Sequence, residues 1–283
     1  MAERRRRQAF FEEASEFTPY LAAFVGEELY FVRTDDPRVG RDVFVRRKRE
    51  DQYVLAKTMK RLSRFGSLPK DPVFVDVGAN IGTTTVAALR RHGFASAVAI
   101  EPSSETSRTL RLNVAVNDLD DRVQALPFAV GDVEGVAGLD MSRDPGRHRL
   151  ADATEAGAEV EVVTLDALVR RGVVDPARVG LLWIDVQGHE PQVLAGASAL
   201  IGAAVPVVAT IRAQAPWPPE LIEQTTAAYT HVVELRKRQD RTRRPQPIEA
   251  LPEILSTLPR IQDILLFRGA ERSRGSEGQR SHT

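Results

Sequence analysis

Cysteine is missing from this chain, and its 283 residues carry no excess of either charge, since 39 Lys and Arg balance 39 Asp and Glu. Without cysteine, disulfides, thiolate catalysis and cysteine-ligated zinc are excluded. A net charge of zero gives no electrostatic signal for nucleic acid or for a membrane surface. No apolar run approaches the ~20 residues that span a bilayer, and the basic start at residues 1–8 lacks the apolar region of a signal peptide. We therefore expect a cytoplasmic protein with neither a membrane nor a nucleic acid as its partner.

The length of the chain predicts one large α/β domain with additions at both ends. An N-terminal extension is expected over residues 1–70, beginning with a solvated basic tail. Two short strands are expected at 29–32 and 43–47, because apolar residues there flank a stretch with Pro and Gly. Apolar residues at helical spacing predict a helix at 50–65, which Gly66 ends.

The main domain is expected over residues 71–268. In its first half, strands and helices alternate: strand 73–77, helix 82–92, strand 97–101, helix 104–116 and strand 123–130. This alternation predicts a doubly wound, mostly parallel sheet, which binds ligands beyond the carboxyl ends of its strands. Because Gly78, Glu101, residues 128–132 and Asp185 all fall at such ends, we expect them to converge on one crevice.

A glycine turn with the sequence Gly78-Ala79-Asn80-Ile81-Gly82 follows the first of these strands. A dinucleotide fold needs Gly-x-Gly-x-x-Gly, whose middle glycine lets the backbone approach a pyrophosphate, whereas Ala79 and Asn80 occupy that approach here. The turn suits a ligand without phosphates whose charged end is an amino acid, as in S-adenosylmethionine. Glu101 is then placed to accept from both ribose hydroxyls, and Asp76 to face the methionine ammonium.

In this interpretation, free backbone amides of the turn and the positive end of the following helix favour the methionine carboxylate. The alternative is an ordinary glycine turn beside one acidic strand end.

A second motif occupies residues 181–191, where an apolar strand delivers Asp185 to the edge of the sheet and Pro191 starts a helix. Asp185, His189 and Glu190 are therefore expected together at the rim, with Asp185 also near the methionine tail or the sulfonium. His189 is the candidate general base, because the pKa of imidazole lies near neutral pH, and Asp185 or Glu190 would orient it or replace it. We expect His189→Ala to lower turnover much more than donor affinity.

Structural interpretations stay open for two residues of this motif: His189 as a hydrogen-bonded turn residue, and Glu190 as a carboxylate at a helix N-terminus. Metal assistance by the same side chains is a competing mechanism. We expect no metal, since the sequence has neither a second carboxylate cluster nor a His-Glu-x-x-His helix.

Several other segments carry weaker signals. Asp166 is expected to cap the helix that follows it, and residues 142–157 are expected to form a polar loop. Trp217 suits either stacking on an acceptor ring or anchoring a buried loop. The basic run at residues 236–244 suits a solvated loop or an anion contact, and residues 269–283 read as a disordered tail.

Five short motifs follow one another over about residues 73–211. They are Asp76-Val-Gly-Ala-Asn-Ile-Gly82, Ile100-Glu-Pro102, Leu112-Asn113 with Asn117, Thr164-Leu-Asp166, and Ile184-Asp-Val-Gln-Gly-His-Glu190 with Gly196-Ala197. This succession resembles the FkbM-type methyltransferase family. The resemblance implies a class I methyltransferase fold, which is Rossmann-like with a doubly wound, mostly parallel seven-stranded sheet, here with an N-terminal α+β extension. It also implies S-adenosylmethionine as cofactor, bound by Asp76, Gly78, Asn80, Gly82 and Glu101, with Asp132 near the adenine.

The same resemblance implies O-methylation of a small molecule, at a hydroxyl of a sugar or of a glycosylated or polyketide natural product, or at a carboxyl. Thr210 stands near a strand end where related sequences often have a glutamate, so an acidic acceptor contact is missing there. Two alternatives from other classes remain: a nicotinamide-dependent oxidoreductase on a similar sheet, and a methyltransferase-like binding protein without catalysis. The extension is expected to serve an acceptor pocket or a homodimer contact.

Overall fold

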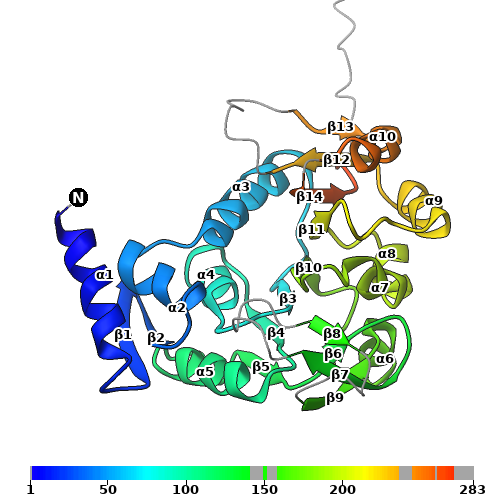
Figure 1. Cartoon of the computed structure of the whole chain (residues 1–283). Helices are drawn as coiled ribbons and strands as arrows, with labels where there is room; N and C mark the ends of the chain where they lie inside the picture. Colours follow the sequence, from blue (N-terminus) through cyan, green and yellow to red (C-terminus); the bar gives the residue numbers. More distant parts are fainter. Residues whose placement is uncertain (1, 141–148, 152–157, 236–243, 259, 271–283) are drawn as a thin grey trace, which may run out of the picture.

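A central sheet of eight strands organises the part of the chain that the computed structural model describes, residues 2–140, 149–151, 158–235, 244–258 and 260–270 (Figure 1). In spatial order its strands are β13 (Gln246–Pro247), β12 (His231–Glu234), β14 (Ile261–Phe267), β11 (Val207–Arg212), β10 (Val179–Ile184), β3 (Val73–Val77), β4 (Ser96–Ile100) and β5 (Val123–Leu126). The five strands from β11 to β5 are parallel, and β14, β12 and β13 pair antiparallel with their neighbours. The expected α/β fold with a mostly parallel sheet is confirmed.

The sheet has one strand more than the expected seven, the edge strand β13. It consists of Gln246 and Pro247, which pair with His231 and Val232 of β12. Proline is tolerated at a sheet edge because it has no N–H to donate to a further strand. A strand of two residues shows no apolar alternation, so the sequence gives no signal for it.

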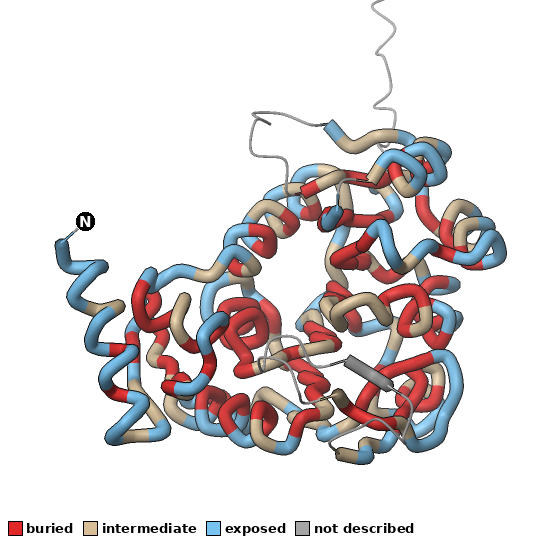
Figure 2. The backbone as a smooth tube through the Cα atoms, viewed as in Figure 1, coloured by how far each residue is buried: buried red, intermediate tan, exposed pale blue. Residues whose placement is uncertain are grey.

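Apolar side chains cover both faces of the sheet and separate into two cores along β10. Leu181 and Trp183 pack into the core under one set of helices, while Leu182 and Ile184 pack into the core under the other. The first set is α3 (Glu50–Phe65), α4 (Thr83–Arg91) and α5 (Ser104–Ala115); the second is α6 (Leu165–Arg170), α7 (Glu190–Ala195), α8 (Ser198–Gly202), α9 (Pro219–Ala228) and α10 (Leu251–Ser256). All six residues of β10 are buried, as expected of a parallel strand covered on both faces (Figure 2).

A second, four-stranded sheet has the order β6 (Ala129–Val130), β9 (Ala158–Val163), β7 (Gly135–Asp140) and β8 (Arg149–Ala151). The single strand expected at residues 123–130 is therefore wrong, because the chain passes from β5 in the main sheet to β6 in this one. Pro127 lies at the break, where its missing N–H interrupts strand pairing. Leu139 of β7 and Val130 of β6 line the same cleft as the ends of β3 and β4.

The N-terminal extension differs from expectation in two places. Residues 2–6 are exposed, as expected of a solvated segment, but they form the first turns of a helix, α1 (Ala2–Ala14), which buries Phe11 and Ala14 further along. Residues 43–47 were expected as a strand, but α2 (Val39–Arg41) and the π-helical turn η1 (Asp42–Arg46) occupy this region. The carboxylate of Asp36 accepts hydrogen bonds from the amides of Arg38, Val39 and Gly40, and so starts a helical turn there.

The remaining elements of the extension agree better with the sequence. The strand expected at 29–32 is β2 (Glu28–Arg33), and its partner is β1 (Tyr20–Val25) in an antiparallel hairpin. Helix α3 covers residues 50–65 as expected, and the amide of Gly66 donates to the carbonyl of Leu62 at its end.

Two asparagines, one in α5 and one just after its end, fasten the extension to the main domain. The side chain of Asn113 accepts from the amide of Phe31 at 2.7 Å and donates to the carbonyls of Phe31 at 3.1 Å and Ile81 at 2.8 Å. Asn117 makes the corresponding pair with the amide and carbonyl of Leu29, at 3.2 and 2.7 Å. These side chains hydrogen-bond the backbone of β2 as a neighbouring strand would, and one of them also holds the glycine turn.

The residue that caps the N-terminus of α6 differs from the one expected. Thr164, not Asp166, caps α6, because its hydroxyl accepts from the amide of Ala167 at 2.9 Å. The carboxylate of Asp166 instead accepts from the amides of Ser198 and Ala199, at 3.0 and 2.8 Å, and so caps α8. Asp166 therefore joins two helices that are distant in sequence.

Three of the expected segments lie wholly or mostly outside the described residues: the loop at 142–157 apart from β8, the basic run at 236–244 apart from Arg244, and the tail at 269–283 apart from its first two residues. Within the described part, none of the helices is long and apolar enough to cross a bilayer. Trp217 is buried in the second core, which favours the loop anchor over the acceptor contact.

Candidate functional site

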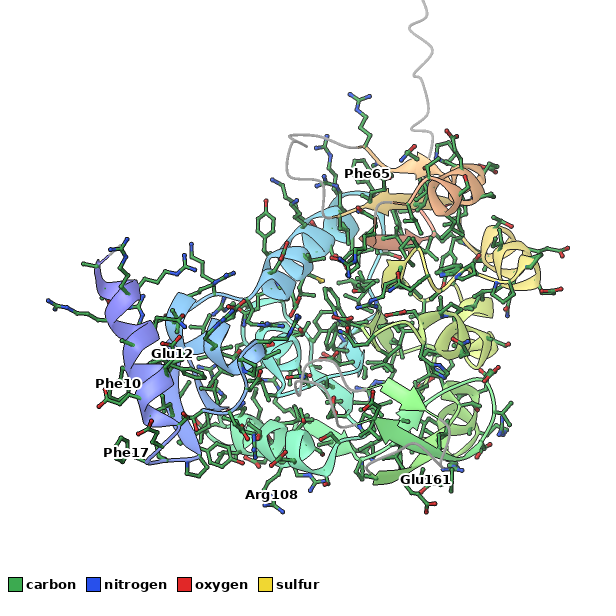
Figure 3. All side chains as sticks on the ribbon, in the orientation of Figure 1. Phe10, Glu12, Phe17, Phe65, Arg108 and Glu161 are labelled. Atoms are coloured by element: carbon green, nitrogen blue, oxygen red, sulfur yellow. The ribbon has the colours of Figure 1, made fainter. Side chains whose placement is uncertain are left out.

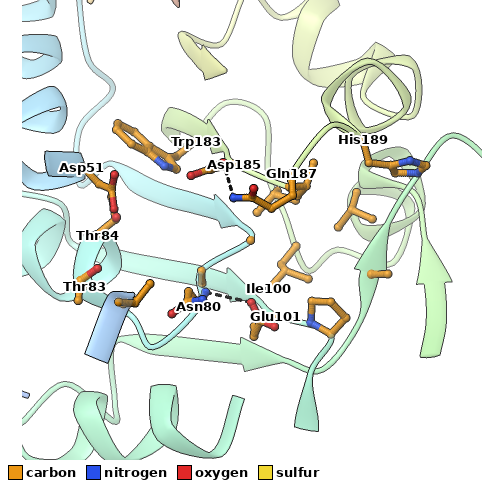
Figure 4. A pocket seen from close by; sticks show the side chains of 18 of the residues that line it. Asp51, Asn80, Thr83, Thr84, Ile100, Glu101, Trp183, Asp185, Gln187 and His189 are labelled. Atoms are coloured by element: carbon orange, nitrogen blue, oxygen red, sulfur yellow. Dashed lines mark hydrogen bonds between the residues drawn. The ribbon is translucent and has the colours of Figure 1, made fainter. Parts of the chain in front are cut away.

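A cleft opens at the carboxyl ends of β3, β4 and β10 (Figure 4). It encloses about 930 Å³ of space, part of it open to solvent. Of the residues predicted from the sequence, it brings together Gly78, Asn80, Glu101, Asp185 and His189. Asp76, Gly82, Asp132 and Glu190 do not line it.

The glycine turn has no free amide to offer a ligand, which corrects the expectation for the methionine carboxylate. The amides of Gly78 and Ala79 donate to the carbonyl of Ile100, and the amide of Gly82 donates to the carbonyl of Ala79. The amide of Asn80 donates to Glu101, and that of Ile81 to the side-chain oxygen of Asn80. The sequence could not show these partners, because they come from the end of β4 and from a local side chain.

Gly78 is required by the neighbouring strand rather than by a ligand. Its φ of +83° is left-handed, and a Cβ at this position would lie 2.2 Å from the carbonyl oxygen of Asp185. The ends of β3 and β10 can approach only because this residue has no side chain. The glycine therefore positions Asp185 at the cleft.

Glu101 forms the floor of the cleft at the end of β4 (Figure 4). Its two carboxylate oxygens accept from the amides of Asn80 and Ser103, each at 3.0 Å. Burial raises the pKa of Glu101 to about 7, and the two amides oppose this shift. Each oxygen keeps a lone pair that two adjacent hydroxyls of a ligand can use.

Asp76 lies beneath the cleft rather than in it. Its carboxylate is buried and accepts a hydrogen bond from the hydroxyl of Thr85, in the first turn of α4, at 2.6 Å. Burial raises the pKa of Asp76 to about 7, and the nearby carboxylates of Asp51, Asp185 and Glu101 add to the shift. In the structure Asp76 thus ties β3 to the start of α4.

A buried arginine organises the second motif. The guanidinium of Arg212, at the end of β11, donates to Asp185 at 2.9 Å and is paired with Glu190. Burial raises the pKa of Glu190 despite this arginine, and one oxygen of Glu190 has no partner. Glu190 therefore holds Arg212, and Arg212 holds Asp185 toward the cleft. Thr210, two residues earlier, is buried and donates to Asp263.

Arg212 was missed by the sequence interpretation, because its position in the chain says nothing about Glu190 and Asp185. The only signal is a basic residue directly after the apolar strand at 205–211. Such a residue at the carboxyl edge of a parallel sheet is brought near the ligand crevice.

His189 lies at the opposite end of the cleft from Asp51 and Thr84, with Asp185 and Gln187 between them (Figure 4). Burial lowers the pKa of His189, and the charge of Asp132 opposes that shift. Asp132 itself is exposed and outside the cleft. The structure thus separates the side chain of His189 from the cluster of Asp185, Arg212 and Glu190. Asp185 and Glu190 belong to the same short sequence motif as His189, so this separation does not follow from their spacing.

Arg49 and Asp51, which the sequence interpretation also missed, lie at the other end of the cleft with Thr83 and Thr84. The two form an ion pair, yet the Nε atom of Arg49 is buried without a hydrogen-bond partner. Both residues precede or begin α3, so only the docking of the extension onto the main domain brings them to the site. An unpartnered buried guanidinium nitrogen indicates a missing acceptor.

No group of three or more His, Asp or Glu side chains in the described ranges is arranged to hold a metal ion.

The FkbM methyltransferase domain matches residues 76–264 of the chain. This chain belongs to the FkbM methyltransferase family. Methyltransferase sdnD of Sordaria araneosa is 29% identical over 160 residues, which cover 46% of this chain and 62% of that protein. The alignment thus spans less than two thirds of this curated relative's length.

Solved structures with a similar arrangement include two methyltransferases. TYW2 of M. jannaschii, solved in complex with AdoMet, has a TM-score of 0.44 at 11% identity, with 89% of this chain and 85% of that chain covered. The O-methyltransferase from Bacillus cereus, solved in complex with SAH, has a TM-score of 0.37 at 11% identity, with 77% and 80% covered. Members of this family use S-adenosylmethionine, as the resemblance implied.

The cleft fits this cofactor in three places. The carboxylate of Glu101 suits the ribose hydroxyls, and the Arg49–Asp51 pair matches the carboxylate and ammonium of an amino acid with opposite charges. His189 lies beside Gly131, which directly follows β6, and the walls of the cleft include the apolar side chains of Phe128, Val130 and Leu139, as a purine base requires.

Proposed function

We propose that this protein transfers a methyl group from S-adenosylmethionine to an oxygen of a small molecule, a hydroxyl or a carboxyl of a sugar or a glycosylated or polyketide natural product. One observation carries the proposal: a single cleft has an opposite-charge pair at one end, a buried carboxylate on its floor and apolar side chains in its walls. Family membership supports the reaction type.

The proposed orientation of the donor follows from these three parts. Arg49 and Asp51 bind the amino-acid end, with the unpartnered Nε of Arg49 donating to the carboxylate. Glu101 binds the ribose, and the apolar end beside Phe128 and Val130 binds the adenine. The sulfonium then lies over the end of β10, next to Asp185. Gly78, Asn80, Gly82 and Asp76 act by shaping the turn and the start of α4, and Asp132 acts through its charge near the adenine end.

Asp185 is the proposed general base. Bound S-adenosylmethionine supplies an activated methyl group, so the chain's own task is to align the acceptor oxygen and to receive its proton. Arg212 donates to only one oxygen of Asp185, at 2.9 Å, and the side chain is about one-quarter exposed at the cleft. Asp185 can therefore accept a proton while Arg212 and Glu190 keep it in place. His189, predicted as the base, is proposed instead to contact the adenine end.

The alternatives fit the structure less well. A nicotinamide dinucleotide needs backbone amides for its pyrophosphate, and every amide from Gly78 to Gly82 already has a partner. A binding protein without catalysis would not require the carboxylate of Asp185 to be fixed at the centre of the cleft by the buried Arg212. Both alternatives remain outcomes of the following experiment.

Titration calorimetry with S-adenosylhomocysteine tests the donor site. We expect the wild-type protein to bind it, Glu101→Ala to bind at least tenfold more weakly, and Asp185→Asn to bind within about threefold of wild type. Methyl transfer to a panel of sugars, glycosylated and polyketide natural products and carboxylic acids then tests the base: Asp185→Asn should lose at least 100-fold in turnover, while His189→Ala should mainly weaken donor binding. Heat with NAD and none with S-adenosylhomocysteine would overturn the proposal.

A further inference from the structure

A basic groove adjoins the donor cleft. It lies mostly within the extension and is lined by Arg and Lys side chains from α1, α2, η1 and α3, from the residue before α2 and from the segment between η1 and α3. Eight cationic side chains line it against three carboxylates. This surplus is notable because the whole chain has a net charge of zero. The lining of the groove is therefore locally cationic, although the chain as a whole is neutral.

The groove and the cleft are continuous, since Val39, Arg49, Asp51 and Gln187 line both. Gln187 also donates to Asp185 at 3.4 Å, so the shared wall reaches the proposed base. A molecule in the groove can thus extend to the place where the methyl group is transferred.

The three carboxylates that line the groove are outnumbered by its cations, one of which, Arg7, is also paired with Glu3 of α1 outside the lining. One carboxylate oxygen of Asp42 is shared by two arginines: it lies 3.2 Å from the Nε of Arg46 and 3.9 Å from a terminal guanidinium nitrogen of Arg41. Lys57 donates to the backbone carbonyl of Leu235 and lies 4.5 Å from the ring centroid of Tyr53, neither of which carries a charge. Such a surplus at the mouth of a site attracts and holds anions.

We propose that the acceptor of the methyl group is an anionic small molecule, bound in this groove through a phosphate or diphosphate group. This inference rests on the proposed function and names its substrate class. Tyr53 is the groove's one aromatic lining residue in the described part of the chain, so the groove lacks the succession of stacking platforms with which proteins bind single-stranded nucleic acid. A compact anion fits it better than a polynucleotide.

Inorganic pyrophosphate is the probe for the test, titrated into protein saturated with S-adenosylhomocysteine. The groove variant is Arg4→Glu with Lys48→Glu, two exposed positions at the groove. The control is Arg108→Glu with Arg111→Glu on α5, which changes the net charge equally; Arg108 points away from the body of the molecule (Figure 3). Both double variants should bind S-adenosylhomocysteine within twofold of wild type, which shows that they are folded.

We expect pyrophosphate to bind the wild type and the control equally, and the groove variant at least tenfold more weakly. Equal weakening in both double variants, or no pyrophosphate binding by a protein that binds S-adenosylhomocysteine, would overturn the inference and leave the proposed function intact. A 20-nucleotide RNA that displaces pyrophosphate at lower phosphate concentration would also overturn it, in favour of a polynucleotide. Failure to bind S-adenosylhomocysteine would instead overturn the proposed function.

Discussion

At the scale of single residues, the role of a side chain in the site depends on where it is buried more than on its residue type. Glu101 and Asp76 are both carboxylates whose pKa burial raises to about 7, yet only Glu101 lines the cleft. Asp185 is held by a buried arginine, whereas His189, four residues later, is separated from that cluster. The same motif therefore supplies residues to two different ends of the site.

The raised pKa of Glu101 predicts a pH dependence of donor binding. Below pH 7 the carboxyl is mostly protonated in the free protein, and only the carboxylate accepts fully from two ribose hydroxyls, so affinity should rise with pH. If binding requires the carboxylate, the affinity for S-adenosylhomocysteine increases about tenfold from pH 6 to pH 8. Calorimetry across this range measures it.

Two variants test whether Glu101 causes the pH dependence of S-adenosylhomocysteine binding. Glu101→Gln should bind weakly at every pH with no dependence, whereas Asp76→Asn should keep the wild-type slope, because Asp76 does not line the cleft. A slope that disappears in Asp76→Asn and persists in Glu101→Gln would show that the wrong carboxyl has been assigned.

At the scale of elements, the strand ends and the turns between them build the site. Gly78 and Gly93 both have left-handed backbones, with φ of +83° and +74°, but only a Cβ on Gly78 would meet another atom, the carbonyl oxygen of Asp185 at 2.2 Å. Gly93→Ala should cost about 1 kcal/mol of unfolding free energy from backbone strain alone. Gly78→Ala should cost at least about 2 kcal/mol more, and should abolish binding of S-adenosylhomocysteine, because β3 and β10 must separate.

Denaturant unfolding and calorimetry measure this pair of variants. Both glycines have a left-handed backbone, so strain of this kind lowers the unfolding free energy similarly in both variants. The difference between the two losses therefore measures the cost of separating the ends of β3 and β10. Equal losses of stability in the two variants would mean that the strand ends can relax without cost.

The elements also show what the sequence can and cannot predict. Strand 73–77 and helix 50–65 were predicted at their observed limits, because apolar periodicity and a terminal glycine are local signals. Helix α1 was missed because four consecutive arginines hide its few buried positions. Arg49, Asp51 and Arg212 were missed in the site because pairing between distant segments brings them there, and no local pattern encodes it.

At the scale of the whole molecule, the extension is part of the site rather than an appendage. Its residues share the first core with β3, α4 and β14, and Gln52 of α3 donates to the carbonyl of Thr83 at the start of α4. Arg49 and Asp51 reach the cleft only through this docking. Asn113 of α5 and Asn117, just after it, are two of the polar contacts that fix it. Variants of these two asparagines separate the docking of the extension from donor binding.

Asn113→Ala removes the partners of Phe31 and of Ile81 in the glycine turn, whereas Asn117→Ala removes those of Leu29. Each leaves buried or half-buried backbone groups unpaired, so each should cost about 1–3 kcal/mol and lower the thermal midpoint by several degrees. Only Asn113→Ala should also weaken S-adenosylhomocysteine binding, by about tenfold, because Ile81 belongs to the turn whose Asn80 amide holds Glu101. Thermal unfolding measures the loss of stability in both variants, and calorimetry measures their affinity for S-adenosylhomocysteine. Equal affinity in the two variants would show that the asparagines hold the extension in place without affecting the donor site.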